Sequence, residues 1–321
     1  MRTCIEICAG AGGQALGLEA AGFRPLTLVE IDGEACSTLR LNRPEWNVIQ
    51  GDVKAFTGER YRGVDLLAGG VPCPPFSIAG KQLGAADERD LFPEALRLVR
   101  EIRPKAVMLE NVRGFLDPAF ESYRSALASQ CRDLGYHVEW RLLNAADFGV
   151  PQQRSRVVIV AMSPTLWHSF SWPEAIAAKP PTVGESLYAL MAERGWTSAS
   201  HWREMANRIA PTIVGGSKKH GGPDLGPTRA KRAWAGLGVD GLGIANTAPE
   251  PEFSGMPRLT VPMVARLQGF PESWHFSGKK TAAYRQVGNA FPPPMATAVA
   301  KQIMNALEAS SCAEETKASK P

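Results

Sequence analysis

Residues 3–15 read TCIEICAGAGGQA, and this stretch decides the fold. An apolar strand over Thr3–Cys8 runs into a glycine loop, and Gln14–Ala21 then has the pattern of a helix closed by Gly22. Glycines at such a turn let backbone amides approach a ligand at the helix N-terminus. Glu30, at the end of a second apolar strand, could accept both hydroxyls of a ribose. The stretch therefore predicts a nucleoside site on an α/β sheet.

The first half of the chain continues to alternate short apolar strands with amphipathic helices, which is typical of a parallel sheet covered on both faces. Further strands are expected at 26–30, 48–50, 64–68, 106–110, 138–143 and 157–161, and helices at 35–42, 92–102 and 123–134. The segment 164–257 is rich in Trp, Gly, Pro and basic residues, with one expected helix at 182–194. Regular spacing returns at 261–268 and 295–307.

This pattern predicts two unequal domains. The larger one combines residues 1–163 with 282–311, and the smaller, irregular one comprises 164–257. Residues 258–281 return the chain to the larger domain, and the polar tail at 312–321 is expected to lack regular structure. Trp196, Trp202 and Trp234 are expected to form the core of the smaller domain.

The composition is that of a globular protein, with 44% hydrophobic residues in 321. We expect a cytoplasmic protein with six reduced cysteines, because neither a membrane-length apolar run nor a signal peptide is evident. The sequence also lacks a metal-ligand cluster. Between Arg194 and Arg232 there are eight Lys or Arg residues against two acidic ones. This run fits either a solvated basic face or a surface that binds phosphates.

Cys73 lies in VPCPPFS at 71–77, directly after the apolar strand, where prolines stiffen the loop. A thiol at the mouth of a buried strand is placed to act as a nucleophile. In open α/β sheets, ligands bind at the carboxyl ends of the strands, so other polar motifs at strand ends should face the same crevice. These are ENV at 110–112, QQRSR at 152–156, RLQGFP at 266–271 and RQVGNA at 285–290.

In this order, the motifs resemble those of the DNA cytosine-5 methyltransferases, over residues 4–161 and 258–300. The resemblance implies a Rossmann-like, S-adenosylmethionine-dependent fold with a target-recognition domain at 164–257. It implies that Cys73 adds to C6 of a flipped-out cytosine while Glu110 shares a proton with N3. Arg154 and Arg156 would hold the O2 side of the base and a nearby phosphate. The methyl group would pass from S-adenosylmethionine to C5.

The resemblance also assigns binding residues. Cofactor contacts transfer to Cys8, Ala9, Gly10, Gly12, Gly13, Glu30, Ile31, Asp52, Val53, Gly70, Pro72, Leu91, Asn289 and Ala290. DNA contacts are expected at Gln82, Gln152, Thr212, Ser217, Lys218, Lys219, Arg229, Lys231 and Arg232. The basic residues from Lys218 to Arg232 alternate with Gly and Pro, as in a loop that follows a groove. Cys8 stands where the family usually has an aromatic residue packed on the adenine.

Other functions account for less of the sequence. A nicotinamide-dependent oxidoreductase fits the Gly-x-Gly-x-x-Ala letters at 10–15 but leaves Cys73 and Glu110 unexplained. A zinc cytidine deaminase fails because His137-x-Glu139 follows the Pro-Cys pair, and no second cysteine has the required spacing. A tRNA-type RNA methyltransferase and a binding protein with an inactive site stay open. The basic insert favours duplex DNA and a monomeric restriction-modification enzyme, in which a cognate endonuclease can be a second component.

Overall fold

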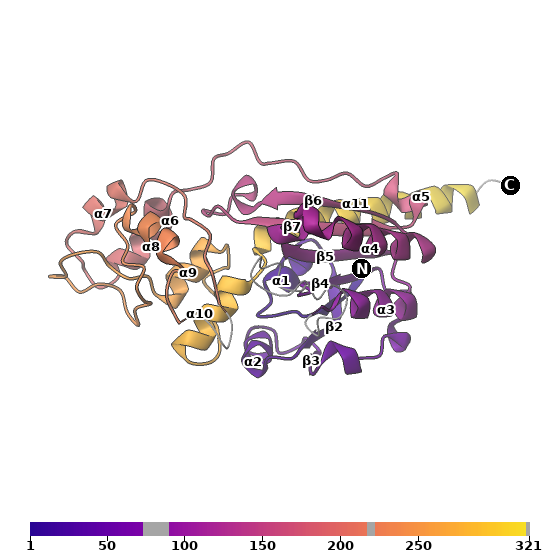
Figure 1. Cartoon of the computed structure of the whole chain (residues 1–321), viewed down its shortest axis with the longest axis horizontal. Coiled ribbons are helices and arrows are strands. Elements are labelled where there is room, and N and C mark those ends of the chain that lie inside the picture. The colour runs from indigo at the N-terminus through magenta and orange to yellow at the C-terminus, as the bar shows by residue number, and fades with distance from the viewer. Residues whose placement is uncertain (73–89, 217–221, 319–321) are drawn as a thin grey trace.

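A single sheet forms the centre of the larger domain (Figure 1). The computed structural model describes residues 1–72, 90–216 and 222–318, with side chains up to residue 310. Within these ranges, seven strands pair in the order β3-β2-β1-β4-β5-β7-β6. Their bounds are Thr3–Ile7 (β1), Arg24–Glu30 (β2), Val48–Gln50 (β3), Leu66–Gly69 (β4), Ala106–Val112 (β5), His137–Asn144 (β6) and Ser155–Met162 (β7).

Strand β7 runs against both of its neighbours, whereas the alternating pattern predicted a parallel sheet. The pairings from β3 to β5 are parallel as expected. The connection at 145–154 holds only a short 3-10 turn, Ala145–Phe148, and has no room for the crossover helix that a parallel strand needs. The reversal places Arg156, near the start of β7, opposite Val112 at the end of β5. The arginine motif therefore still reaches the expected edge of the sheet.

Helices cover both faces of this sheet, as the sequence predicts (Figure 1). They are α1 (Gly13–Ala20), α2 (Gly33–Asn42), α3 (Phe92–Ile102), α4 (Glu121–Asp133) and α11 (Pro293–Ala318). Leu18 of α1 and Val299 of α11 share one apolar layer with Met108. Leu98 of α3 and Leu127 of α4 pack in the layer on the opposite face. Successive strand residues alternate between these layers, which explains the continuous apolar runs in the sequence.

Helix α11 is longer than its apolar spacing indicated. It continues through Ala318 into the tail, where an absence of regular structure was expected. The helix starts on Pro293, which suits a first turn because proline lacks the amide hydrogen that would be unpaired there. Among the described residues, no helix is long and apolar enough to cross a membrane.

The smaller domain packs around its tryptophans, as predicted. Trp196, Trp202 and Trp234 are 5%, 2% and 0% exposed, and all three belong to one apolar cluster. The helices of this part and of the return segment are α5 (Pro164–Trp167), α6 (Val183–Ala192), α7 (Ala199–Met205), α8 (Thr228–Ala235), α9 (Val261–Leu267) and α10 (Lys280–Asn289). A long connection from α5 to α6 leads from the sheet to this domain (Figure 1).

The basic stretch of the smaller domain differs from the expected groove-following loop. Arg229, Lys231 and Arg232 lie on α8, whose buried face holds Trp234. Arg229 and Arg232 are exposed, whereas Lys231 is half-buried and pairs with Asp224 at 2.9 Å. Glycines and prolines around this stretch disfavour a helix, so the sequence pattern did not predict the short helix α8.

Candidate active site

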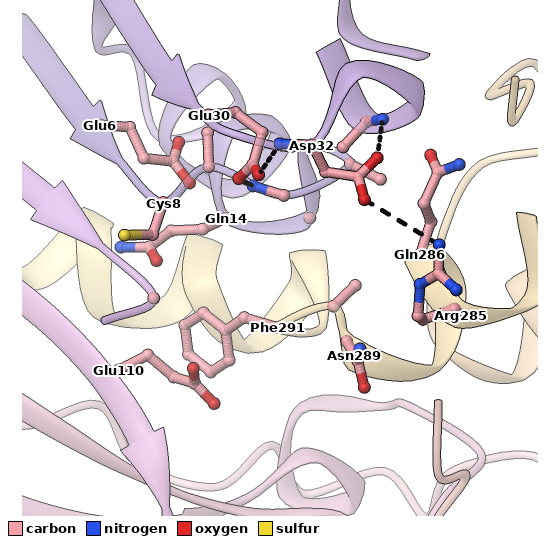
Figure 2. A pocket seen from close by; sticks show the side chains of 17 residues that line it. Glu6, Cys8, Gln14, Glu30, Asp32, Glu110, Arg285, Gln286, Asn289 and Phe291 are labelled. Atoms are coloured by element: carbon pink, nitrogen blue, oxygen red, sulfur yellow. Dashed lines mark hydrogen bonds and ion pairs between the residues drawn. The ribbon is translucent and has the colours of Figure 1, made fainter. Parts of the chain in front are cut away.

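A cavity of about 230 Å³ lies at the carboxyl ends of β1, β2, β4 and β5, closed by the junction of α10 and α11 (Figure 2). The residues predicted to bind the cofactor that line it are Cys8, Ala9, Gly10, Gly13, Glu30, Gly70, Asn289 and Ala290. Glu110, predicted to be catalytic, lines it as well. The remaining predicted cofactor residues, Gly12, Ile31, Asp52, Val53, Pro72 and Leu91, lie outside its lining.

The glycine loop fits tightly against the rest of the domain. Gly12 has a φ of 90°, and a Cβ there would lie 2.8 Å from side-chain atoms of both Leu39 and Trp274. A Cβ at Gly13 would collide with the carbonyl oxygen of Phe291. At Gly10, with a φ of 54°, a Cβ would meet no described atom within 4 Å. The loop thus needs glycine for packing at 12 and 13, and for its conformation at 10.

Glu30 joins this loop to the start of α2. Its two carboxylate oxygens accept hydrogen bonds from the backbone N–H groups of Gly10 and Asp32, each at 2.7 Å. Asp32 in turn caps α2 by accepting from the N–H of Glu34 at 2.9 Å. Arg285 of α10 reaches Asp32 at 3.9 Å across the cavity (Figure 2). Arg285 was predicted only as part of the RQVGNA motif, without a role of its own. Asp32 was not predicted, and the helix-capping pattern after Glu30 was the available signal for it.

Two buried oxygen atoms on the cavity wall have no hydrogen-bond partner among the described residues. They are Oε2 of Glu6 and Oε1 of Gln14. Burial, with the nearby charge of Glu30 adding to it, raises the pKa of Glu6 well above its usual range. Gln14 donates its amide hydrogen to the carbonyl of Met108 at 3.3 Å, which fixes its orientation. A carboxyl group that keeps its proton can donate as well as accept, and the amide oxygen of Gln14 accepts, so these atoms fit a ligand that brings hydrogen-bonding groups into the cavity.

Glu110 and Arg156 form an ion pair at the adjoining edge of the sheet. Nε of Arg156 lies 2.6 Å from Oε1 of Glu110, and the two side chains are 13% and 12% exposed. Burial raises the pKa of Glu110 above its usual range, against the opposing effect of Arg156 and Arg154. A Cβ at Gly70 would lie 3.6 Å from the other oxygen, Oε2, of Glu110. The carboxyl group therefore sits where β4 leads into the cysteine loop.

The cysteine loop itself, with Cys73 and Gln82, lies outside the described residues. Its two described flanks, Pro72 and Leu91, meet through a hydrogen bond of 3.1 Å from the Leu91 N–H to the Pro72 carbonyl. Asn111 donates to the carbonyl of Val71 at 3.0 Å, next to Glu110. The ends of the loop are thus tied to each other and to β5.

Arg154 and Gln152 occupy positions different from those expected. Both are 0% exposed. Arg154 donates to the backbone carbonyls of Ile213, Gly288 and Ala290 at 2.8 to 2.9 Å. Gln152 donates to Gln268 and to the carbonyl of Leu267. Neither side chain is exposed in this structure, so the expected DNA contact of Gln152 and the expected role of Arg154 at the base or a phosphate stay predictions.

The other predicted DNA residues are partly described. Thr212 is exposed and donates its hydroxyl to the Gln153 carbonyl at 2.5 Å. Ser217, Lys218 and Lys219 lie outside the described residues. No group of three or more His, Cys, Asp or Glu side chains that could hold a metal ion occurs in the part of the chain that the structure describes.

Comparison with known proteins identifies the family. Residues 2–305 match the model of the C-5 cytosine-specific DNA methylases. Type II methyltransferase M.NgoMIV of Neisseria gonorrhoeae is 58% identical over 95% of this chain and 98% of its own length. Type II methyltransferase M.NaeI of Lentzea aerocolonigenes is 57% identical, over 94% of this chain and 75% of its own.

Solved structures agree with the fold. A DNA modification methyltransferase from an E. coli prophage superposes with a TM-score of 0.68 at 22% identity, covering 96% of this chain and 100% of that one. A DNMT2 mutant of Spodoptera frugiperda gives 0.67 at 17% identity, covering 95% and 100%. These likenesses confirm the predicted methyltransferase sheet. By the family match and its relatives, the chain belongs to the C-5 cytosine-specific DNA methylases and is a DNA cytosine methyltransferase.

Proposed function

We propose that this enzyme methylates C5 of a flipped-out cytosine within a short sequence of duplex DNA, through a covalent adduct with Cys73. The observation that carries the proposal is the buried Glu110–Arg156 pair beside the start of the cysteine loop. A carboxyl group with a raised pKa can hold a proton for a ring nitrogen, and the neighbouring guanidinium keeps it oriented. Such a group is useless to a protein that only binds DNA.

The chemistry assigns each residue one task. The Cys73 thiolate forms a bond to C6, and the electron pair of the C5–C6 double bond becomes available at C5 while Glu110 gives its proton to N3. As C5 takes the methyl group, the N3 proton returns to Glu110, and the donor is left as S-adenosylhomocysteine. Loss of the C5 proton to water then restores the C5–C6 double bond and expels the thiolate. S-adenosylmethionine, when bound, supplies the methyl group as an electrophile on a sulfonium. Because C6 is not reachable inside a stacked duplex, the base has to leave the helix.

The cavity fits S-adenosylmethionine. Each carboxylate oxygen of Glu30 accepts one backbone hydrogen bond and keeps a lone pair for a ribose hydroxyl. The unpartnered oxygen of Gln14 can accept from an amino group of such a ligand, and the protonated carboxyl group of Glu6 can accept or donate beside it. Asn289 and Ala290 would close the cavity over it. We infer no metal requirement, since none of these tasks needs one.

We place duplex DNA between the sheet edge and the smaller domain. The exposed Arg229 and Arg232 on α8 can contact phosphates there. The relatives named Type II methyltransferases support a restriction-modification role, in which the enzyme acts as a monomer. We propose that the reaction takes place in the cytoplasm, where bacterial DNA lies. The smaller domain, residues 164–257, would supply target recognition.

The decisive experiment follows tritiated methyl groups from S-adenosylmethionine into unmethylated plasmid DNA. Cys73→Ser should abolish transfer and leave cofactor binding intact. Cys131→Ser serves as the matched control, because Cys131 lies buried on α4 and burial raises the pKa of its thiol to about 11. Bisulfite sequencing of the product then maps the target sequence. Absence of transfer into any mixed-sequence duplex, or transfer into RNA alone, would overturn the proposal.

Glu110→Gln tests the proton-sharing role. It removes the proton while keeping the size of the side chain, so we expect a large fall in turnover with DNA affinity retained. An equal loss of DNA affinity would instead make Glu110 a DNA anchor or a structural residue.

A further inference from the structure

Gln152, Arg154 and Gln268 form a polar cluster inside the protein, at the boundary between the two domains. Each of these side chains is 0% exposed. Gln152 precedes β7 by a few residues, and Gln268 follows α9 directly. Their amide groups meet, with Nε2 of Gln152 donating to Oε1 of Gln268 at 2.5 Å. Polar groups are costly to bury unless they are hydrogen-bonded, so the partners of this cluster indicate what it does.

On one side, the cluster holds the segment 210–216 of the smaller domain, here called the recognition segment. The N–H of Ile213 donates to Oε1 of Gln152 at 2.9 Å, and its carbonyl accepts from Nη1 of Arg154 at 2.8 Å. Both backbone polar groups of this one residue are therefore bound by side chains of the larger domain. Thr212, its exposed neighbour, bonds to the carbonyl of Gln153. The segment cannot shift without breaking these bonds.

On the other side, the same cluster holds the wall of the cofactor cavity. Nη2 of Arg154 donates to the carbonyls of Gly288 and Ala290, both at 2.9 Å. Gln268 donates to the carbonyls of Val287 and Ala290 at 2.9 and 3.1 Å. These carbonyls end helix α10, where a cation also complements the helix dipole. Ala290 lines the cavity, so the cluster sets the position of that wall.

The recognition segment and the cavity wall also touch directly. A Cβ at Gly288 would lie 2.5 Å from the Cα of Gly215, so the two backbones are in close contact. Asn289, on the cavity, donates its amide hydrogen to the carbonyl of Gly216 at 3.1 Å. Tyr284 of α10 donates its hydroxyl to the carbonyl of Val214 at 3.1 Å. A movement of either backbone is therefore passed to the other, since packed interfaces do not deform continuously.

We propose that Gln152, Arg154 and Gln268 are positioning residues that make cofactor binding and DNA binding depend on each other. The proposal rests on the proposed function, which puts the cofactor in the cavity and DNA between the sheet edge and the smaller domain. The recognition segment borders that space through Thr212, an exposed residue expected to contact DNA. A cofactor that holds the end of α10 in place also holds the recognition segment in the position that binds DNA. DNA bound to that segment holds the end of α10 in turn. Linkage requires the two effects to be equal, and such couplings commonly change affinity by about 5- to 150-fold.

The test measures the affinity for S-adenosylhomocysteine by calorimetry, with and without saturating unmethylated plasmid DNA. The ratio of the two dissociation constants is the coupling. We expect the wild type to bind S-adenosylhomocysteine about tenfold more tightly with DNA present. Gln268→Met, which removes the bonds to Gln152 and the α10 carbonyls, should bring the ratio close to one. Gln302→Met, on α11 and remote from the cluster, is the matched control and should keep the wild-type ratio.

A second, milder variant keeps the test valid if Gln268→Met fails to fold. Tyr284→Phe removes one hydroxyl bond to Val214 and leaves the ring in place, so it should fold and lower the ratio partially. Wild-type ratios in both variants, together with a lower melting temperature for Gln268→Met, would overturn the proposal and leave the cluster a purely structural role. The methyl-transfer assay keeps the two hypotheses separate. A wild type that transfers methyl groups but has a ratio of one refutes the coupling alone, and inactivity refutes the proposed function.

Discussion

Replacing Arg156 by Met should destabilise the protein in a pH-dependent way. The change removes the cation that lies 2.6 Å from Glu110 and keeps an apolar stem of similar length. With side chains only 13% and 12% exposed, water compensates the lone carboxylate poorly. Removing one partner of a buried ion pair costs about 3–5 kcal/mol, and the slight exposure here points to about 3 kcal/mol. This cost applies only while Glu110 is ionised.

The sign of the pH dependence follows from the same pair. Burial already raises the pKa of Glu110, and Arg156 lowers it, so the pKa of Glu110 in Arg156→Met is higher still. A carboxyl group whose pKa is higher in the folded than in the unfolded state loses its stabilising contribution as the pH rises through the folded-state pKa. The deficit in the free energy of unfolding should therefore grow from about pH 5 to pH 8.

Urea denaturation of both proteins across this range measures the deficit. In a Glu110→Gln background, Arg156→Met should give a deficit without this pH dependence. Arg194→Met, at an exposed pair with Glu250, should cost less than about 1 kcal/mol at any pH. A deficit for Arg156→Met that is constant with pH, or that is largest in acid, would refute the reasoning.

Two further substitutions test the cavity and the smaller domain. Gly13→Ala should weaken S-adenosylhomocysteine binding in calorimetry and lower the melting temperature, because the new methyl group collides with the Phe291 carbonyl. Gly51→Ala is the control: its Cβ would have no described atom within 4 Å, so neither quantity should change. Trp202→Phe should cost more unfolding free energy than Trp234→Phe in urea titrations. The indole N–H of Trp202 donates to the Gly238 carbonyl, whereas that of Trp234 has no described partner. Equal costs would contradict this account.

The sequence predicted best where the signal is local. The glycine loop and Glu30 follow a strand–turn–helix pattern of short range, and the structure brings both to one cavity. The apolar runs of the strands and the spacing of α3 likewise predicted elements within a few residues of their ends. The three tryptophans of the smaller domain were predictable as core because large apolar side chains seldom stay exposed.

The sequence predicted poorly where the outcome depends on distant partners. The sequence does not show whether an arginine in a motif contacts a phosphate or backbone carbonyls. Arg154 donates to three carbonyls, those of Ile213, Gly288 and Ala290, which lie far from it in the sequence. Gln152 is hidden by contacts more than a hundred residues away, at Leu267 and Gln268. The direction of β7 depends on the connection at 145–154, which is too short for a crossover helix, whereas the apolar pattern of the strand is the same in either direction.

Burial and nearby carboxyl groups make the thiol inside the cavity a poor candidate for the nucleophile. Cys8 lies there with Glu6 and Glu30 nearby, and burial together with these carboxyl groups raises the pKa of its thiol to about 12. It therefore stays neutral at physiological pH and is a poor nucleophile. The acidic side of the cavity suits a positively charged cofactor. Arg156 lies instead next to Glu110 and the start of the cysteine loop, and while Glu110 holds its proton the guanidinium charge there would favour a thiolate. Under the proposed function, the methyl donor would thus bind among the carboxyl groups of the cavity, and the nucleophile would lie on the side of Arg156.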